Sequence, residues 1–202
     1  MIEQLVNEIN GLLRDGYPYS ALGIALTLPD ICGNIAYPNT KVADHYKKWY
    51  SEYVNPISAL KFKDGFDEEI CYKLRCAYLH SGNFDLGNAD AVKNINKFEI
   101  HYNRDPDLRF VQAAQETDGK LSLDIDLGVL CWQLCTAATD FYKAHQSECS
   151  KATIEIEDTT PSEDERKALR KLIEEKCGYT FEELKEMKRK DPSFELDFDF
   201  LK

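Results

Sequence analysis

The sequence predicts a mainly α-helical protein: a bundle of about five helices, a small β-hairpin or short sheet inserted at about 97–126, and a helical C-terminal tail. Three observations support this fold class. Apolar residues recur at helical spacing in several segments. Short segments between them alternate apolar and polar residues. The composition becomes strongly charged from about residue 150. We therefore divide the chain into 1–150, the bundle with its β insertion, and 151–202, an acidic helical appendage.

The first two helices follow from apolar spacing and from their end signals. A first helix is stopped by Gly16. Its apolar residues lie at i, i+3, i+4 and i+7: Ile2, Leu5, Val6, Ile9, Leu12 and Leu13. A second helix should begin near Pro18, because proline suits the first helical position, and break at Pro29. We expect residues 30–34 to form a tight turn into a loop.

Capping residues mark the third and fourth helices. Thr40 is the predicted N-cap of the third, which Asn55-Pro56 ends. Asp67 is the predicted N-cap of the fourth, and Gly82 is its stop signal. The core-facing side of the fourth helix is expected to carry Ile70, Leu74, Ala77 and Tyr78.

The β insertion is predicted from alternation with a period of two. Residues 98–102 and 121–125 alternate apolar and polar side chains, which is typical of half-buried strands. Residues 109–113 are a candidate third strand, and Asp118-Gly119 is a turn signal before the last strand.

The last strand leads into a fifth long helix, expected from Leu127 to Glu148. Asp124 and Asp126 flank an isoleucine on the strand, so we expect them on a solvated face. The side chains expected inside the bundle are Leu130, Leu134, Ala137, Ala138 and Phe141.

The tail should hold two short amphipathic helices. Residues 160–163 predict a capping box with proline at N1, and Gly178 closes that helix. Residues 180–183 predict a second capping box, and an acidic-aromatic segment follows at 194–200. Two interpretations are open. The tail is a solvated appendage packed on the bundle, or it covers a functional site, where its end mimics nucleic acid or docks on a partner.

Charge and cysteine usage restrict the class of protein. The net charge of −11 disfavours broad electrostatic binding of nucleic acid, so any RNA contact should be confined to a local cleft. The seven cysteines show no zinc-like spacing, and we expect reduced core thiols of a cytoplasmic protein. The N-terminus lacks the features of a signal peptide, and no stretch reaches the length of a membrane span. Phosphate-loop, dinucleotide and serine-hydrolase motifs are missing from the sequence, which disfavours a conventional nucleotide-dependent enzyme. We predict no metal and no cofactor.

The segment Cys71–Gly82 contains the strongest candidate site. It places Arg75 and His80 at the C-terminal end of an apolar helix, where a permanent charge and a group that titrates near neutral pH are both unusual. On an ideal α-helix the two residues lie about 140° apart. A joint function therefore requires a frayed helix end or a second subunit.

Arg-x-x-x-x-His near the end of a helix in a small α-helical core resembles the HEPN superfamily (higher eukaryotes and prokaryotes nucleotide-binding domains). The surrounding residues 74–82, and the upstream segment Leu28–Gly33, are similar to uncharacterised bacterial HEPN-like proteins. The resemblance covers about residues 1–147.

The resemblance implies a helical bundle that forms a homodimer and, in active members, cuts RNA without a metal. Carried onto this chain, Arg75 would stabilise the charged phosphorane, and His80 would exchange protons with the attacking or leaving oxygen. Tyr72, Cys76 and Ser81 are candidate binding residues. Cys76 departs from the family, whose active members commonly carry a polar residue there. The resemblance also implies a role in a toxin or defence system, with an antitoxin or another protein as a partner.

A non-catalytic interpretation also stays open. Arg75 could pair with a carboxylate such as Asp30 or Asp44, and His80 could cap helix carbonyls. The chain would then be an oligomerisation or interaction module. His45 lies on a helix with an aromatic stripe that is more typical of a core than of a base-stacking surface.

Overall fold

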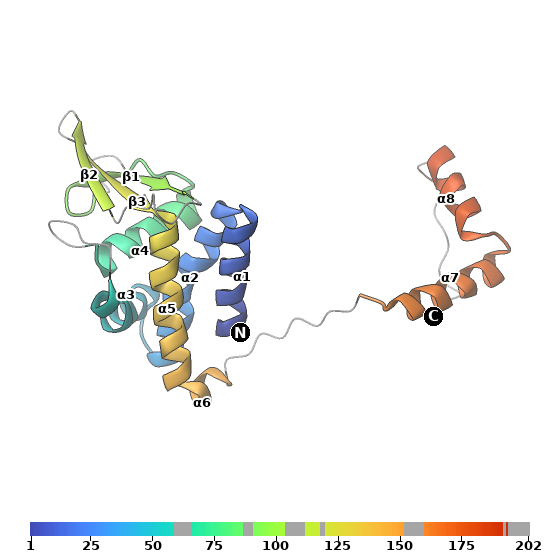
Figure 1. The fold of residues 1–202 in the computed structure, drawn as a ribbon, viewed down its shortest axis with the longest axis horizontal. Coiled ribbons are helices and arrows are strands. Elements are labelled where there is room, and N and C mark those ends of the chain that lie inside the picture. Colours follow the sequence, from blue (N-terminus) through green and yellow to red (C-terminus); the bar gives the residue numbers. More distant parts are fainter. Residues whose placement is uncertain are drawn as a thin grey trace. The chain divides into compact units, whose positions relative to one another are not determined.

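The computed structural model confirms the mainly α-helical fold with a short sheet (Figure 1). It describes residues 1–58, 66–86, 91–103, 112–117, 120–151, 160–191 and 193. Contacts divide the chain into two compact units, Met1–Glu155 and Ile156–Lys202. No described helix is both long enough and apolar enough to cross a bilayer.

The first unit is built on helices whose ends the sequence marks. Its α-helices are α1 (Ile2–Asp15), α2 (Pro18–Ala36), α3 (Val42–Trp49), α4 (Glu68–Cys76), α5 (Leu127–Ala144) and α6 (Gln146–Cys149). Three shorter turns extend them: the π-helices η1 (Tyr50–Val54) and η3 (Ala77–Ser81), and the 3-10 helix η2 (Asn55–Ile57). As predicted, Gly16 and Gly82 adopt left-handed conformations at helix ends, and the side chain of Asp67 accepts a hydrogen bond from the Ile70 amide.

The predicted break at Pro29 was wrong, because α2 continues through it to Ala36. Leu28, Pro29, Cys32 and Gly33 are all buried, so packing outweighs the backbone hydrogen bond that proline cannot donate. Gly33 has a specific role here. A Cβ atom at this position would lie 2.6 Å from the carbonyl oxygen of His45, so glycine permits the close approach of α2 and α3. The predicted turn at 30–34 is therefore helical.

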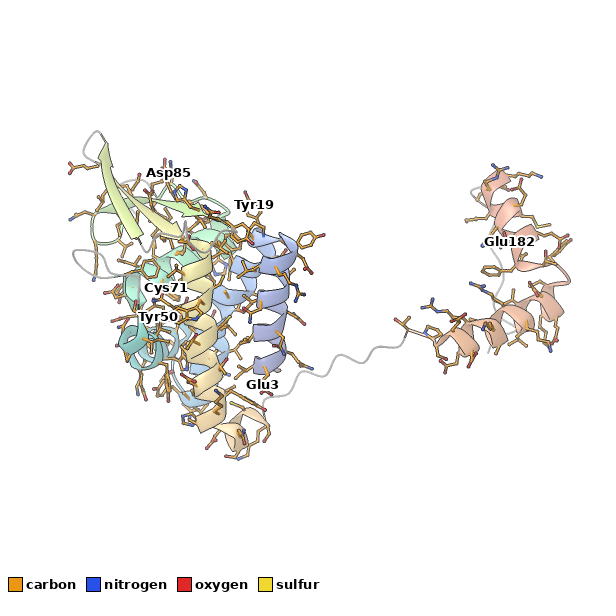
Figure 2. The ribbon with its side chains drawn as sticks, in the orientation of Figure 1. Glu3, Tyr19, Tyr50, Cys71, Asp85 and Glu182 are labelled. Atoms are coloured by element: carbon orange, nitrogen blue, oxygen red, sulfur yellow. The ribbon has the colours of Figure 1, made fainter. Side chains whose placement is uncertain are left out.

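The third helix starts one residue later than predicted. Lys41 is the N-cap, and the Thr40 hydroxyl donates to the Tyr37 carbonyl instead. The aromatic stripe expected on this helix, Tyr46, Trp49 and Tyr50, is fully buried, as expected for a core. Figure 2 places Tyr50 and Cys71 among these helices, and both side chains are inaccessible to solvent. In the fourth helix and the turn after it, the predicted residues Ile70, Leu74 and Ala77 are buried, whereas Tyr78 is only partly buried against the core.

The β insertion is a three-stranded sheet of order β1-β3-β2, formed by β1 (Ile95–His101), β2 (Gln112–Thr117) and β3 (Lys120–Asp126). β3 pairs in parallel with β1 and antiparallel with β2. In Figure 1 the strands lie at the end of the bundle where α5 begins. The predicted turn at 118–119, and residues 109–111 of the candidate third strand, lie outside the described residues.

The expectation that Asp124 and Asp126 are solvated was wrong, since they are only 5% and 1% exposed. β3 is the central strand, and Asp126 is the N-cap of α5, accepting a hydrogen bond from the Val129 amide at 2.9 Å. All five side chains expected inside the fifth helix are buried. That helix ends at Ala144, earlier than predicted, and α6 follows it.

The second unit contains α7 (Glu163–Cys177) and α8 (Phe181–Lys190). The capping box of α7 is formed by Ser162 and Glu165, two residues later than predicted. The predicted box of α8, between Thr180 and Glu183, is confirmed, as is the left-handed Gly178 that closes α7. The acidic-aromatic segment 194–200 lies outside the described residues.

Candidate functional site

The structure brings Arg75 and His80 into contact within one chain. Nη1 of Arg75 lies 2.7 Å from Nε2 of His80. This is possible because residues Ala77–Ser81 form a π-turn rather than an α-turn. The i→i+5 bonding of a π-helix places residues five apart on adjacent turns of one face, whereas an α-helix separates them by about 140°. Neither a frayed helix end nor a second subunit is needed for the contact.

Asp30 on α2 holds the guanidinium of Arg75 in place. Its Oδ2 atom lies 3.0 Å from Nε and 2.8 Å from Nη2 of Arg75. The side chains of Arg75 and Asp30 are 14% and 18% exposed, so the pair is largely shielded from solvent. Asp30 reaches α4 because α2 stays helical beyond Pro29. Asp44, the other carboxylate considered from sequence, is exposed on α3.

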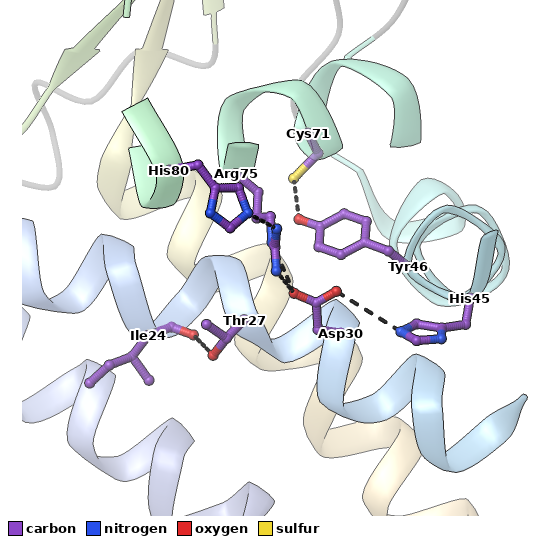
Figure 3. A network of polar contacts seen from close by, with 8 residues as sticks. All are labelled: Ile24, Thr27, Asp30, His45, Tyr46, Cys71, Arg75 and His80. Carbon is purple, nitrogen blue, oxygen red and sulfur yellow. Dashed lines mark hydrogen bonds and ion pairs between the residues drawn. The ribbon is translucent and has the colours of Figure 1, made fainter. Parts of the chain in front are cut away.

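His45 on α3 extends this group on the far side of Asp30. Its Nε2 lies 4.0 Å from Oδ1 of Asp30. Both Oδ1 of Asp30 and Nδ1 of His45 are buried and have no hydrogen-bond partner among the described residues. Figure 3 shows His45, Asp30, Arg75 and His80 as a continuous polar row that crosses α3, α2, α4 and η3. We refer to these four residues as the helix cluster.

Burial and charge act in opposite directions on the two ionised residues of the helix cluster. Burial raises the pKa of the Asp30 carboxyl, and the charge of Arg75 opposes but does not cancel that rise. For Arg75, burial acts to lower the pKa, but the charge and hydrogen bond of Asp30 outweigh it and the pKa is raised. Arg75 therefore remains a cation in a fixed orientation.

The contact between Arg75 and His80 also assigns the tautomer of the imidazole. A guanidinium can only donate hydrogen bonds, so Nε2 of His80 is the acceptor. The proton of a neutral His80 ring is then carried by Nδ1. Because the His80 side chain is exposed, a substrate from solvent could reach it. The arrangement pairs a fixed cation with a proton-transfer group at the surface.

The three candidate binding residues lie close by in sequence but differ in their contacts. Cys76 is half-buried. Burial raises the pKa of the Tyr72 hydroxyl, and Cys76 adds to that rise. For Arg75, whose pKa burial lowers and Asp30 raises, Cys76 adds to the effect of Asp30. The Tyr72 ring packs edge-on against Tyr46 at 5.2 Å. The hydroxyl of Ser81 donates to the Ala77 carbonyl at 2.7 Å, so it serves the helix end.

A separate groove of about 410 Å³ lies between α3 and α4 and does not include Arg75 or His80. Its lining is of mixed charge: Lys47, Lys48, Ser51, Glu52, Glu68 and Glu69. Lys47 is bound to Glu69 at 2.7 Å. The groove therefore lacks the surplus of positive charge that a phosphate backbone favours.

Sequence reasoning named Asp30 only as a possible structural partner and did not connect His45 to the site. Both residues could have been found by predicting that the second helix continues through Pro29, because Asp30 then faces the third and fourth helices, which carry His45 and Arg75. Comparisons of the chain with protein-family models, curated proteins and solved structures found no match. The resemblance to the HEPN superfamily therefore stays a prediction.

Proposed function

We propose that the first unit is a HEPN-like RNA-binding and RNA-cleaving unit whose reactive groups are Arg75 and His80. The observation that supports this proposal is the 2.7 Å contact between Nη1 of Arg75 and Nε2 of His80. Asp30 holds the same guanidinium through a hydrogen bond from Nε. A cation held in a fixed orientation beside an accessible imidazole supplies charge stabilisation and one proton-transfer group for phosphodiester cleavage without a metal.

The proposed reaction is an internal transesterification of RNA. The 2′-hydroxyl attacks the adjacent phosphorus, its proton passes to His80, and the 5′-oxygen leaves after taking up a proton, which yields a cyclic phosphate and a 5′-hydroxyl. Arg75 donates to the phosphorane oxygens. In the free protein Arg75 donates a hydrogen bond to Nε2 of His80. A bound phosphate competes for the same N–H group and so frees Nε2 to accept the proton.

The proposal includes a homodimer, in which a second copy of the chain brings its own Arg75 and His80 to the cleft. The second imidazole would supply the proton for the leaving oxygen. Because the protein has a net charge of −11, this local site and not the general surface would hold the RNA. A cytoplasmic role in a toxin or defence context, with an antitoxin or another protein as partner, belongs to the same proposal.

The direct test is incubation of the full chain with single-stranded RNA in EDTA, followed by analysis of the product ends. We expect cyclic phosphate ends, and no cleavage of RNA that lacks the 2′-hydroxyl at the reacting position. His80→Asn and Arg75→Ala should each lower the rate by about 100-fold or more. Arg75→Lys should also fail, because an ammonium keeps the charge but loses the fork that contacts Asp30 and the phosphate together.

Two matched variants serve as controls. His101→Ala removes another exposed histidine, and Asp44→Asn removes an exposed carboxylate of α3. Both should cleave at the wild-type rate. If wild-type protein neither cleaves RNA nor binds it more tightly than Arg75→Ala, the proposal is wrong.

The shielded ion pair of Asp30 and Arg75 favours a second candidate, a non-catalytic oligomerisation or interaction module. In that case Arg75 joins α2 to α4 and His80 completes the helix end. Light scattering of wild type and Arg75→Lys separates the candidates. An inactive wild type that is dimeric, with a dimer weakened by Arg75→Lys, would support the module.

A further inference from the structure

A second group of polar side chains lies on the sheet, away from the helix cluster. β1 and β3 pair in parallel, with Glu99 opposite Asp124 and His101 opposite Asp126. Alternate residues of a strand share a face, and paired residues of neighbouring strands do too. These four residues therefore lie on one face of the sheet. We refer to them as the strand cluster.

Three of these side chains converge closely enough to bind one ion. The ligand atoms of Glu99, His101 and Asp124 all lie within 4.8 Å of one another. Nε2 of His101 is 3.6 Å from Oδ1 of Asp124. Bond lengths of about 2.1 Å to nitrogen and oxygen ligands place such atoms about 3.4 Å apart around a tetrahedral ion. A small contraction, within the range of side-chain rotation, would complete the geometry.

The burial of Asp126 is a further indication of a cation near this face. Asp124 is 5% exposed and Asp126 is 1% exposed. One oxygen of Asp126 caps α5, while its Oδ2 is buried and has no hydrogen-bond partner among the described residues. Buried carboxylates are costly unless a positive charge or a metal compensates them. The exposed sides of Glu99 and His101 leave a path from solvent.

Among the described residues, Lys97 is a positive charge that competes with a metal ion at this face. Its Nζ atom donates to Oε1 of Glu99 at 2.6 Å, and both side chains are exposed. A carboxylate has two oxygens, so Lys97 can keep one while the other binds an ion. The charge of Lys97 nevertheless repels a metal ion at this site. Removing that charge should therefore strengthen metal binding, whereas removing a ligand should weaken it.

We propose that Glu99, His101 and Asp124 bind a divalent transition-metal ion, with Asp126 adding a buried negative charge on the same face. One imidazole and two carboxylates form a donor set that suits ions such as Mn²⁺, Co²⁺ or Zn²⁺ and does not select for the soft ions that thiolates prefer. This site is independent of the proposed RNA cleavage, which proceeds in EDTA.

The test is titration of the full chain with Co²⁺, followed by calorimetry and visible absorption. We expect one ion per chain, with the absorption of nitrogen and oxygen ligands and without the intense charge-transfer bands that cysteine thiolates produce. His101 is exposed, so His101→Ala should not disturb folding. The substitution should weaken Co²⁺ binding by more than about tenfold, because removing even a residue that hydrogen-bonds to a metal ligand can cost that much affinity. Glu99→Gln should act in the same direction.

Two further variants make the result specific. Lys97→Met should tighten Co²⁺ binding, because it removes the competing charge. His80→Ala, in the helix cluster, should leave it unchanged. If wild type binds Co²⁺ no more tightly than His101→Ala, or if the spectrum shows thiolate ligands, the proposed site is wrong.

Discussion

The helix cluster and the strand cluster both place carboxylates beside histidines, but their charge is compensated from different sources. In the helix cluster, one aspartate faces one arginine, and the largely shielded pair is balanced within the chain. In the strand cluster, two buried aspartates and Glu99 share a face with Lys97, which is exposed and bound to Glu99. Among the residues that the structure describes, this face of the sheet therefore carries more negative than positive charge.

This difference indicates how each cluster meets a ligand. The helix cluster offers a partly shielded guanidinium in a fixed orientation beside an exposed imidazole, so it suits an anion such as a phosphodiester. The strand cluster offers oxygens and a nitrogen, so it suits a cation from solvent. The same residue types thus favour opposite ligands, and the variants below test whether the charge balance is the reason.

The largest expected effect comes from removing the internal cation of the helix cluster. Arg75→Met should lower the free energy of unfolding by about 3 kcal/mol, because it leaves the shielded Asp30 carboxylate without its partner. Urea denaturation measures this loss. In the double variant Asp30→Asn/Arg75→Met, part of the stability should return, since no uncompensated charge remains.

The matched control is Arg14→Met. Arg14 and Asp15 form an ion pair with side chains 79% and 58% exposed, so its loss should cost under about 0.5 kcal/mol. If Arg75→Met is as mild as Arg14→Met, the ion pair does not hold α2 against α4, and the two clusters do not differ as described.

The next effect concerns the helix packing that positions the helix cluster. Gly33→Ala should destabilise the protein by about 2 kcal/mol, because the new Cβ would lie 2.6 Å from the His45 carbonyl oxygen and push α3 away from α2. Gly11→Ala is the control. Its Cβ would meet only the end of the Arg14 side chain at 3.8 Å, so it should stabilise α1 by up to about 1 kcal/mol. Equal shifts in thermal unfolding for both variants would contradict the role of Gly33.

The features that sequence predicted well are those set by a few adjacent residues. Asp67 and Thr180 cap helices, and Gly16, Gly82 and Gly178 end them, because a cap or a left-handed residue acts within one turn. The position of Arg75 in the last turn of α4, and of His80 just before Gly82, was predicted for the same reason.

The features that sequence missed depend on contacts between distant segments. α2 passes Pro29 because its second half is buried against other helices, and no local signal reports that packing. Arg75 meets His80 through a π-turn, which ideal helix geometry does not anticipate. The strand cluster arises from parallel pairing of β1 with β3, which the predicted hairpin did not include.

A smaller effect should appear in the strand cluster when its charge is lowered in metal-free buffer. Asp126→Asn keeps an oxygen that can cap α5 and removes one buried negative charge, so unfolding in EDTA should require about 1 kcal/mol more. Asp126→Ala loses the cap and should be less stable than Asp126→Asn by about 1 kcal/mol. If Asp126→Asn is instead destabilised in EDTA, the sheet face carries no surplus of negative charge.

The smallest expected effect is a pH dependence that belongs to Asp30. Burial, opposed by Arg75, raises the pKa of this carboxyl in the folded protein above its value of 3.8 in the unfolded chain. The folded state then binds more protons between these two values, so the contribution of Asp30 to stability is greatest below pH 3.8 and falls as the pH rises through the folded pKa. The free energy of unfolding of wild type minus that of Asp30→Asn should therefore decline over this window and stay constant above it. Subtracting the variant removes the titration of the other carboxylates. A difference that rises with pH would mean that the charge of Arg75 outweighs burial and lowers the pKa of Asp30. Arg75 would then compensate the Asp30 charge more strongly than the burial of the pair indicates.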